Sequence, residues 1–146
     1  QQQAQIKRLL ESQKMTEQEA ECIRIRDIRR FVESGLGQRM KKAAMKKHLY
    51  REQPFVIQRN ASMLDDGWKN ETVLVQGIID AYFMEEEEIV LVDYKTDRVK
   101  RGQEQKLIDL YHVQLEDYAR ALERMTGKRV KEKIIYSFTL QKEILL

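Results

Sequence analysis

Hydrophobic positions recur at helical spacing in the first part of the chain. Thr16 and Glu19 form a capping box, so we predict a helix that starts near residue 17. Its apolar face consists of Ala20, Ile23, Ile28 and Phe31. A Ser-Gly-Leu-Gly break follows at residues 34–37, and a second helix, rich in basic residues, is predicted over residues 37–48.

The pattern then changes to apolar runs and alternation that are typical of strands. Three strands are predicted, over residues 49–58, 72–83 and 89–95. Pro54 indicates that the first strand lies at a sheet edge or contains a bulge, because proline cannot donate a ladder hydrogen bond. The polar residues 59–71 are predicted to be a loop.

A helix and one more strand are predicted in the last third of the chain. Residues 96–110 are polar and basic and are predicted to be a loop. An amphipathic helix should cover residues 112–126 and end at Gly127, before a last strand over residues 130–140.

The order of helices, three strands, helix and strand predicts an α/β or α+β domain. We expect a central mixed β-sheet flanked by helices, with an N-terminal helical segment. Residues 1–146 would form one domain, with residues 1–48 as a helical lead-in and residues 49–146 as the sheet core. The opening is helical in composition without a start signal, so we expect the chain to be a fragment of a larger protein.

Composition excludes several classes of protein. The chain is 42% hydrophobic and 35% charged, which suits one core with a highly charged surface. It has no apolar run of membrane-spanning length and no signal segment at its start. Cys22 is the single cysteine, which excludes a disulfide framework, a cysteine-ligated zinc site or a four-cysteine iron–sulfur cluster within this chain. A cytoplasmic protein without membrane contact is expected.

Charge is distributed unevenly along the chain. Residues 1–51 contain 13 Lys and Arg against 6 Asp and Glu, residues 52–97 contain 3 against 11, and residues 98–146 contain 11 against 7. An acidic centre between basic flanks favours a metal site with phosphate-binding surroundings. Ordinary solvated charge is the alternative explanation of this pattern.

The predicted hairpin over residues 72–95 contains the main chemical signal. If Glu86 and Glu87 are the two turn residues, Asp80 stands directly opposite Asp93. Side chains at such positions have Cβ atoms roughly 4.5–5.5 Å apart, which lets two carboxylates share one hard cation. Lys95 is two residues from Asp93 and therefore points to the same face. A buried Asp–Lys salt bridge is the structural alternative.

These residue types suit hydrolysis of a phosphodiester. Two carboxylates hold Mg²⁺ or Mn²⁺ and leave positions for water and a phosphate oxygen. Such a metal activates water and neutralises charge that develops on phosphorus. Lys95 would position the attacking water or stabilise the pentacovalent phosphorus, and the backbone carbonyl of Tyr94 is a further candidate metal ligand.

Three motifs in order resemble a known family. They are Gly77-Ile78-Ile79-Asp80, Asp93-Tyr94-Lys95 and Gln114-x-x-x-Tyr118. Together they resemble the RecB-like branch of the PD-(D/E)xK nucleases, with a restriction-endonuclease-like core. Over roughly residues 16–140 the sequence is most similar to the C-terminal nuclease domains of the bacterial AddAB helicase–nucleases.

The resemblance implies an Mg²⁺-dependent deoxyribonuclease, an exonuclease that processes double-strand-break ends for recombinational repair in the bacterial cytoplasm. It implies Asp80, Asp93 and Lys95 as catalytic residues. Contacts to DNA would come from Gln114, Tyr118, Thr96 and Arg98. The implied partners are DNA, the parent helicase domains and an AddB-like second subunit, and ATP would be used only by the parent helicase.

One motif of the family is missing from this chain. The family has Gly-Thr-x-x-His on an upstream helix, and neither His48 nor His112 fits that pattern. We therefore expect this fragment alone to be weakly active or inactive. Two other hypotheses remain, namely a non-catalytic DNA-binding or subunit-docking module with the same fold, and a stand-alone restriction-type or CRISPR-associated nuclease.

Some residues are open to two interpretations. Tyr118 lies on the apolar stripe of its predicted helix, so core packing is an alternative to a role at the site. Glu52 is an acidic candidate near the site, although a strand-edge salt bridge is favoured. The basic residues 39–47 suit phosphates, a solvated face or a surface against the parent protein equally well.

Overall fold

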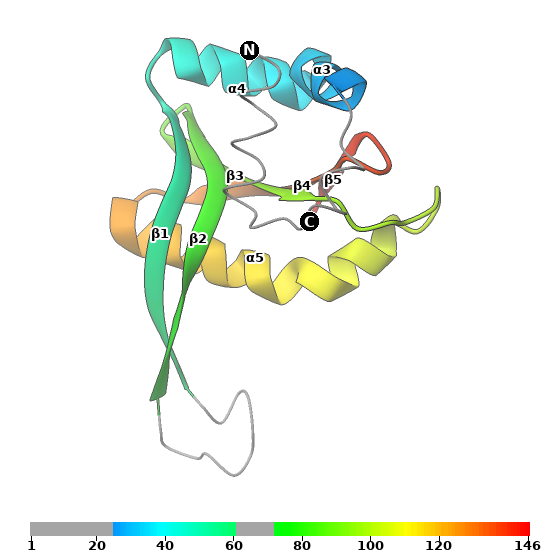
Figure 1. Ribbon diagram of the computed structural model, residues 1–146. Coiled ribbons are helices and arrows are strands. Elements are labelled where there is room, and N and C mark those ends of the chain that lie inside the picture. Colours follow the sequence, from blue (N-terminus) through cyan, green and yellow to red (C-terminus); the bar gives the residue numbers. More distant parts are fainter. Residues whose placement is uncertain (1–24, 61–71) are drawn as a thin grey trace.

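The computed structural model describes residues 25–60 and 72–146. Figure 1 shows three layers, with a sheet between a pair of helices on one face and one long helix on the other. The helices are α3 (Ile25–Glu33), α4 (Gly35–Met45) and α5 (Glu104–Thr126). The strands are β1 (Leu49–Asn60), β2 (Thr72–Glu85), β3 (Glu88–Lys95), β4 (Val130–Ser137) and β5 (Lys142–Leu145).

The described part of the chain forms one mixed sheet with the order β1-β2-β3-β4-β5. Neighbouring strands are antiparallel except for β3 and β4, which are parallel. Parallel neighbours need a crossover connection, and α5 supplies it on one face of the sheet. The predicted mixed sheet with flanking helices is therefore confirmed, and β1 is an edge strand, as Pro54 indicated.

Several boundaries differ from the sequence prediction, and the largest differences lie in the last third of the chain. Helix α5 begins at Glu104, so the predicted loop over residues 96–110 is shorter than expected. The predicted strand over residues 130–140 ends at Ser137 as β4, and a further strand that was not predicted, β5, follows after a turn. Gln141 has a φ of 54° in this turn, and the Ser137 hydroxyl accepts a hydrogen bond from the Leu140 N–H at 3.1 Å. This local geometry reverses the chain where the apolar pattern alone continued.

The break between the two N-terminal helices is reduced to one capping residue. The Ser34 hydroxyl accepts a hydrogen bond from the Gly37 N–H at 3.0 Å and so caps α4, which starts at Gly35. A Cβ atom on Gly37 would lie 2.1 Å from the Phe31 carbonyl oxygen. Glycine is required here because α3 and α4 approach each other through their backbones.

Each face of the sheet has its own hydrophobic core. The core beneath α3 and α4 includes Ile28, Leu36, Met40, Phe83, Val92 and Tyr136. The core beneath α5 includes Phe55, Ile79, Leu91, Leu107, Leu115 and Ile135. Because side chains of a strand alternate between faces, β3 is apolar on both sides and is the most buried strand of the described sheet.

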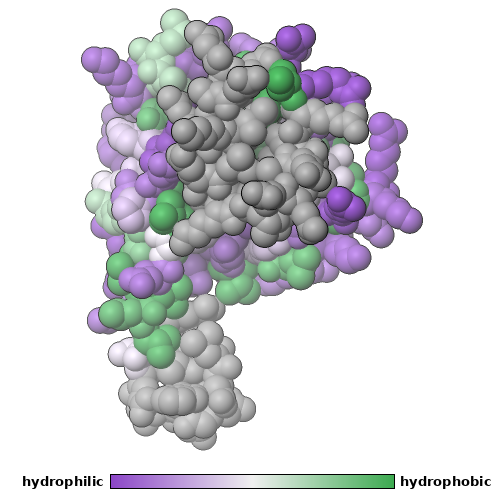
Figure 2. Space-filling model, in the orientation of Figure 1, coloured by the Kyte–Doolittle hydropathy of each residue, from purple (hydrophilic) through white to green (hydrophobic). Residues whose placement is uncertain are grey.

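The β1–β2 hairpin extends beyond these cores. Apolar side chains gather along it in Figure 2, and Val56 and Leu74 are 59% and 68% exposed. The capping box at Thr16 and Glu19, Cys22 and residues 61–71 of the predicted loop lie outside the described residues. No described helix is long and apolar enough to cross a membrane.

Candidate active site

The register of the β2–β3 hairpin agrees with the sequence prediction. Ala81 pairs with Val92 and Glu85 with Glu88, so one further step along the ladder brings Asp80 beside Asp93. The turn residues Glu86 and Glu87 have φ angles of 51° and 72°. Positive φ at both positions is what a two-residue type I′ turn requires, even though glutamate is a poor choice for it.

The alternation of side chains between the two faces of the sheet is interrupted in β2 near Asp80. Ile79 and Tyr82 both belong to the core beneath α5, although they are three residues apart, whereas Ala81 belongs to the other core. The alternation of side chains must therefore shift between Ile79 and Ala81. Glu52, the residue of β1 opposite Asp80, has a φ of 53°, so the irregularity involves both strands. Such irregularities re-aim side chains next to functional sites.

Asp80 is a buried carboxylate with 6% exposure. One of its oxygens, Oδ2, accepts a hydrogen bond from the backbone N–H of Tyr94 at 2.9 Å. Burial and then the nearby charge of Asp93 raise the pKa of the Asp80 carboxyl far above its usual range, against the opposing effects of the Tyr94 N–H and Lys95. Two negative charges at this site are therefore unfavourable without a further cation.

Asp93 and Lys95 lie on β3 and face α5. The Lys95 Nζ atom is 2.9 Å from Asp93 Oδ2. Lys95 is therefore the cation that pairs with this almost fully buried carboxylate. One lysine thus faces two buried carboxylates, and a further bound cation would balance the remaining negative charge.

Lys95 is held by helix α5 as well as by Asp93. Its Nζ donates a hydrogen bond to Gln114 Oε1 at 3.0 Å and lies 4.0 Å from the centroid of the Tyr111 ring. The Tyr111 hydroxyl in turn donates to Asp97 Oδ2 at 2.7 Å. The ammonium group is thus fixed in position on three sides.

Tyr111 and Asp97 were missed by the sequence analysis. A signal for Tyr111 was present, since it precedes Gln114 by three residues and Tyr118 by seven, which places all three on one helix face. Asp97 carried no comparable signal. Its link to Tyr111 exists only because α5 packs back across the end of β3.

The predicted DNA-contacting residues fall into two groups. Gln114 and Tyr118 lie at the site. The Tyr118 ring packs edge-on against Phe55 at 5.0 Å, and burial and then the charges of Asp93 and Asp80 raise the pKa of its hydroxyl. Tyr118 therefore has both a packing contact and a place beside the carboxylates.

Thr96 and Arg98 lie in the segment that follows β3. The Thr96 carbonyl accepts a hydrogen bond from the Thr139 hydroxyl at 3.3 Å, and Arg98 is exposed. Glu52 is also exposed and has no ion pair with another described residue. These residues border the carboxylates rather than join them.

The donor set around the carboxylates is small. Among residues 25–60 and 72–146, no group of three or more His, Cys, Asp or Glu side chains is arranged to hold one metal ion. Asp80 and Asp93 are the two carboxylates that the sequence predicts as metal ligands, with the Tyr94 carbonyl as a backbone candidate. Two carboxylates leave open positions on a hard divalent cation.

The described residues thus place two carboxylates and a lysine at an irregularity of a mixed sheet that lies between helices. Residues 1–144 match the PD-(D/E)XK nuclease superfamily, and the chain belongs to that superfamily.

Within this superfamily, the chain is similar to the A subunits of bacterial ATP-dependent helicase/nucleases. The chain is 39% identical over 145 residues to the A subunit of the ATP-dependent helicase/nuclease of Clostridium novyi (strain NT), covering 96% of the chain and 12% of the relative. Identity is 44% over 140 residues to the corresponding protein of Acetivibrio thermocellus, covering 92% and 11%. That of Thermoanaerobacter sp. (strain X514) is 42% identical over 138 residues, with the same coverage. The chain thus spans about 12% of the length of these relatives, and the predicted resemblance to helicase–nucleases is confirmed.

Proposed function

We propose that the chain is a metal-dependent DNA nuclease domain that hydrolyses phosphodiester bonds at the Asp80–Asp93 site. One observation carries this proposal. Two buried carboxylates lie together beside one fixed lysine, and burial together with Asp93 raises the pKa of Asp80. A purely structural ion pair would not need a second buried carboxylate.

Asp80 and Asp93 would hold Mg²⁺ or Mn²⁺, with the backbone carbonyl of Tyr94 as a further ligand. The bound metal would polarise a phosphate oxygen and lower the pKa of a water molecule. The raised pKa of Asp80 supports this assignment, because it reports a carboxylate pair with too little positive charge around it. The Tyr94 N–H fixes the orientation of the Asp80 carboxylate.

Lys95 would act on the reacting groups. Its contacts with Asp93, Gln114 and the Tyr111 ring keep the ammonium group in one place. A positive charge that is fixed in advance stabilises negative charge on phosphorus without reorganisation, and its N–H groups can orient the attacking water. Gln114 is therefore both a positioning residue for Lys95 and a candidate contact to DNA.

DNA would approach the site along the end of β3 and the adjoining face of α5. Arg98, which is exposed, suits a phosphate contact, and Thr96 lies next to Lys95 on the chain. Tyr118 offers a hydroxyl beside the carboxylates. These three residues, with Gln114, would position the strand so that one phosphodiester reaches the metal.

The names of the relatives support a setting in a larger protein. We infer that the chain is the nuclease domain of an ATP-dependent helicase–nuclease, in which ATP is used only by the helicase domains. An AddB-like second subunit would be its partner, and DNA-end processing in bacterial recombinational repair would be its task. The similarity to these relatives extends over 92–96% of the chain.

The decisive experiment combines cleavage with metal binding. Linear DNA should be cut in the presence of Mg²⁺ and not in EDTA, and calorimetry should detect Mn²⁺ binding that is lost in Asp80→Ala. Asp109→Ala, which removes an exposed carboxylate on α5, is the matched control and should bind Mn²⁺ normally. Unchanged Mn²⁺ binding in Asp80→Ala would refute the metal site.

Cleavage should be compared between this chain and a longer chain that includes a preceding Gly-Thr-x-x-His helix. The longer chain should cut faster, because the described residues supply only two acidic ligands. A protein that binds DNA but cuts in neither form would instead support the non-catalytic binding or docking module.

A further inference from the structure

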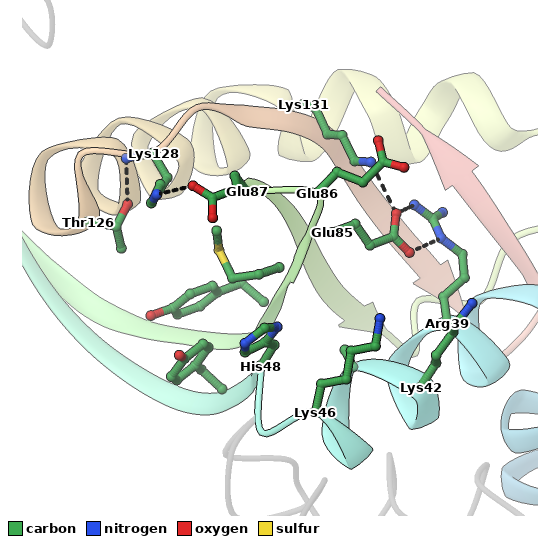
Figure 3. A pocket seen from close by; sticks show the side chains of 14 residues that line it. Arg39, Lys42, Lys46, His48, Glu85, Glu86, Glu87, Thr126, Lys128 and Lys131 are labelled. Atoms are coloured by element: carbon green, nitrogen blue, oxygen red, sulfur yellow. Dashed lines mark hydrogen bonds and ion pairs between the residues drawn. The ribbon is translucent and has the colours of Figure 1, made fainter.

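A second concave site lies at the other end of the β2–β3 hairpin. The cleft has a volume of about 870 Å³ and opens between helix α4, the first residues of β1, the β2–β3 turn and the segment that joins α5 to β4 (Figure 3). It is separated from the carboxylate pair by the five residue steps from Asp80 to Glu85, which is about 16 Å of extended strand. None of the proposed catalytic residues lines it.

Most charges in the cleft neutralise one another. Glu85 forms ion pairs with Arg39 at 2.7 Å and Lys131 at 3.2 Å, and Glu87 forms one with Lys128 at 2.9 Å. Arg39 also pairs with Glu132 at 2.6 Å. These pairs build the wall of the cleft and leave their charges satisfied.

Two lysines that line the cleft take no part in these ion pairs. Lys42 and Lys46 line the cleft from α4 and its C-cap, and neither has an ion pair with a described residue. They are four residues apart and so lie on one helix face, about 6 Å apart along the axis. Figure 3 draws both lysines on the α4 side of the cleft and Glu86 on the side of the β2–β3 turn. Glu86 is the one lining glutamate without an ion pair to a described residue. Within this part of the chain, two unpaired cations therefore face one unpaired anion.

An aromatic platform forms the floor beside these lysines. Tyr50 and Tyr82 are stacked, with ring centroids 4.8 Å apart and an interplanar angle of 17°. Tyr82 is 6% exposed, whereas Tyr50 is 41% exposed, so Tyr82 supports the ring and Tyr50 presents it. His48 lines the same cleft beside Tyr50. An exposed, supported ring next to cations is the arrangement that binds an unpaired base with its phosphates.

We propose that this cleft binds single-stranded DNA, with a base stacked on Tyr50 and the flanking phosphates on Lys42 and Lys46. The inference rests on the proposed function in taking the ligand to be a DNA strand. The cleft would hold the strand a few nucleotides away from the carboxylate pair. It adds a contact region that the three sequence motifs do not contain.

The test measures the affinity of the 146-residue chain for a fluorescent oligothymidylate by anisotropy in EDTA. Lys42→Glu and Lys41→Glu are a matched pair, since both reverse one charge on neighbouring exposed positions of α4 and only Lys42 lines the cleft. Lys42→Glu should weaken binding about tenfold more than Lys41→Glu. In Lys42→Ala/Lys46→Ala the slope of log Kd against log salt should fall by about 0.7 for each phosphate that is no longer neutralised. Equal affinities of the two charge reversals would overturn the proposal and leave the cleft as a surface for protein contacts.

Tyr50 supplies a second, independent readout. Tyr50→Ala should weaken binding about tenfold or more, because a base loses its stacking surface, whereas Tyr50→Phe should bind like the wild type. Wild-type affinity in Tyr50→Ala would also overturn the proposal. Thermal unfolding confirms that each variant is folded.

Two further comparisons distinguish a strand site from a mononucleotide site, and DNA binding in the cleft from cleavage at the carboxylates. Thymidine monophosphate should compete far more weakly than the oligonucleotide, and equal competition would identify a mononucleotide site instead of a strand site. Because binding is measured without metal, a protein that never cuts DNA can still show the cleft contacts. Conversely, cleavage could depend on Asp80 while Lys42→Glu leaves the affinity unchanged. That result would refute DNA binding in the cleft and leave the proposed function intact.

Discussion

The two ends of the β2–β3 hairpin hold carboxylates in opposite electrostatic conditions. At the turn end, Glu85 is partly exposed and paired with Arg39 and Lys131, which lower the pKa of its carboxyl to about 2 despite the opposing effect of burial. At the other end, Asp80 is buried beside Asp93 with Lys95 as the nearby cation, and the pKa of the Asp80 carboxyl is raised.

The contrast separates a structural acid from the acid that we propose to be functional. Both carboxylates lie on β2, five residues apart, so the strand itself does not distinguish them. The number of cations within reach and the depth of burial do. At the turn end Glu85 is matched by two cations, whereas Asp80 and Asp93 share one lysine, and in the proposed function a metal would supply further positive charge. Perturbed carboxylates of the second kind are typical of functional sites.

The largest effect is expected when one of the two proposed metal-binding carboxylates is removed. Asp80→Asn should lower the rate of DNA cleavage by about 10³-fold or more, because loss of the metal removes several kcal/mol of transition-state stabilisation. Cleavage of linear DNA with Mg²⁺ in excess measures this effect. Asp109→Asn, on the exposed face of α5, should keep the wild-type rate. Retained cleavage in Asp80→Asn would show that the two ends do not differ in function.

Lys95→Ala is expected to lower the cleavage rate by about 10²–10³-fold while metal binding persists. The physical reason is that the carboxylates hold the cation, whereas the ammonium acts where charge changes during the reaction. Cleavage, Mn²⁺ calorimetry and thermal unfolding should be measured on one preparation. A loss of stability with a merely proportional loss of activity would identify Lys95 as a structural partner of Asp93. Lys106→Ala, exposed on α5, is the control.

The metal-free protein should be stabilised by Asp80→Asn at neutral pH, by at least about 1 kcal/mol. The pKa of Asp80 is raised on folding, so its contribution to stability is fully present below about pH 4 and is lost as pH rises through the folded-state pKa. Thermal unfolding in EDTA from about pH 4 to pH 8 should therefore show a decline in the wild type that Asp80→Asn lacks. If stability changed with pH in the same way in both proteins, the raised pKa of Asp80 would be contradicted.

The smallest expected effect concerns the turn end. Glu85→Gln should lower stability at neutral pH by about 1 kcal/mol or less, since the ion pairs are partly exposed and screened by solvent. The pKa of Glu85 is lowered on folding, so its contribution is present above about pH 4 and is lost as pH falls toward 2. Acid titration of stability should be flatter in Glu85→Gln than in the wild type. Glu86→Gln, one residue along the turn, should leave the profile unchanged.

Local features of the chain were sufficient to predict the hairpin and its register. Pairing across a two-residue turn is determined by neighbouring positions, so residue spacing alone could place Asp80, Asp93 and Lys95 together. The same holds for Gly127, whose left-handed φ of 70° ends α5 as its position after an amphipathic stretch predicted. These features depend on interactions within a short stretch of chain.

Tertiary structure decided the features that depend on distant segments. The hydrogen bonds from Tyr111 to Asp97 and from Lys95 to Gln114 exist because α5 packs on one face of the sheet. The cleft lined by Lys42 and Tyr50 exists because α4 packs on the other face. The shift of facing at Asp80 likewise depends on the matching distortion at Glu52 in the neighbouring strand. By itself the sequence determined the fold class, the carboxylate pair and the family. The charge balance around each carboxylate was decided only on folding, because desolvation and distant cations act through space and not along the chain.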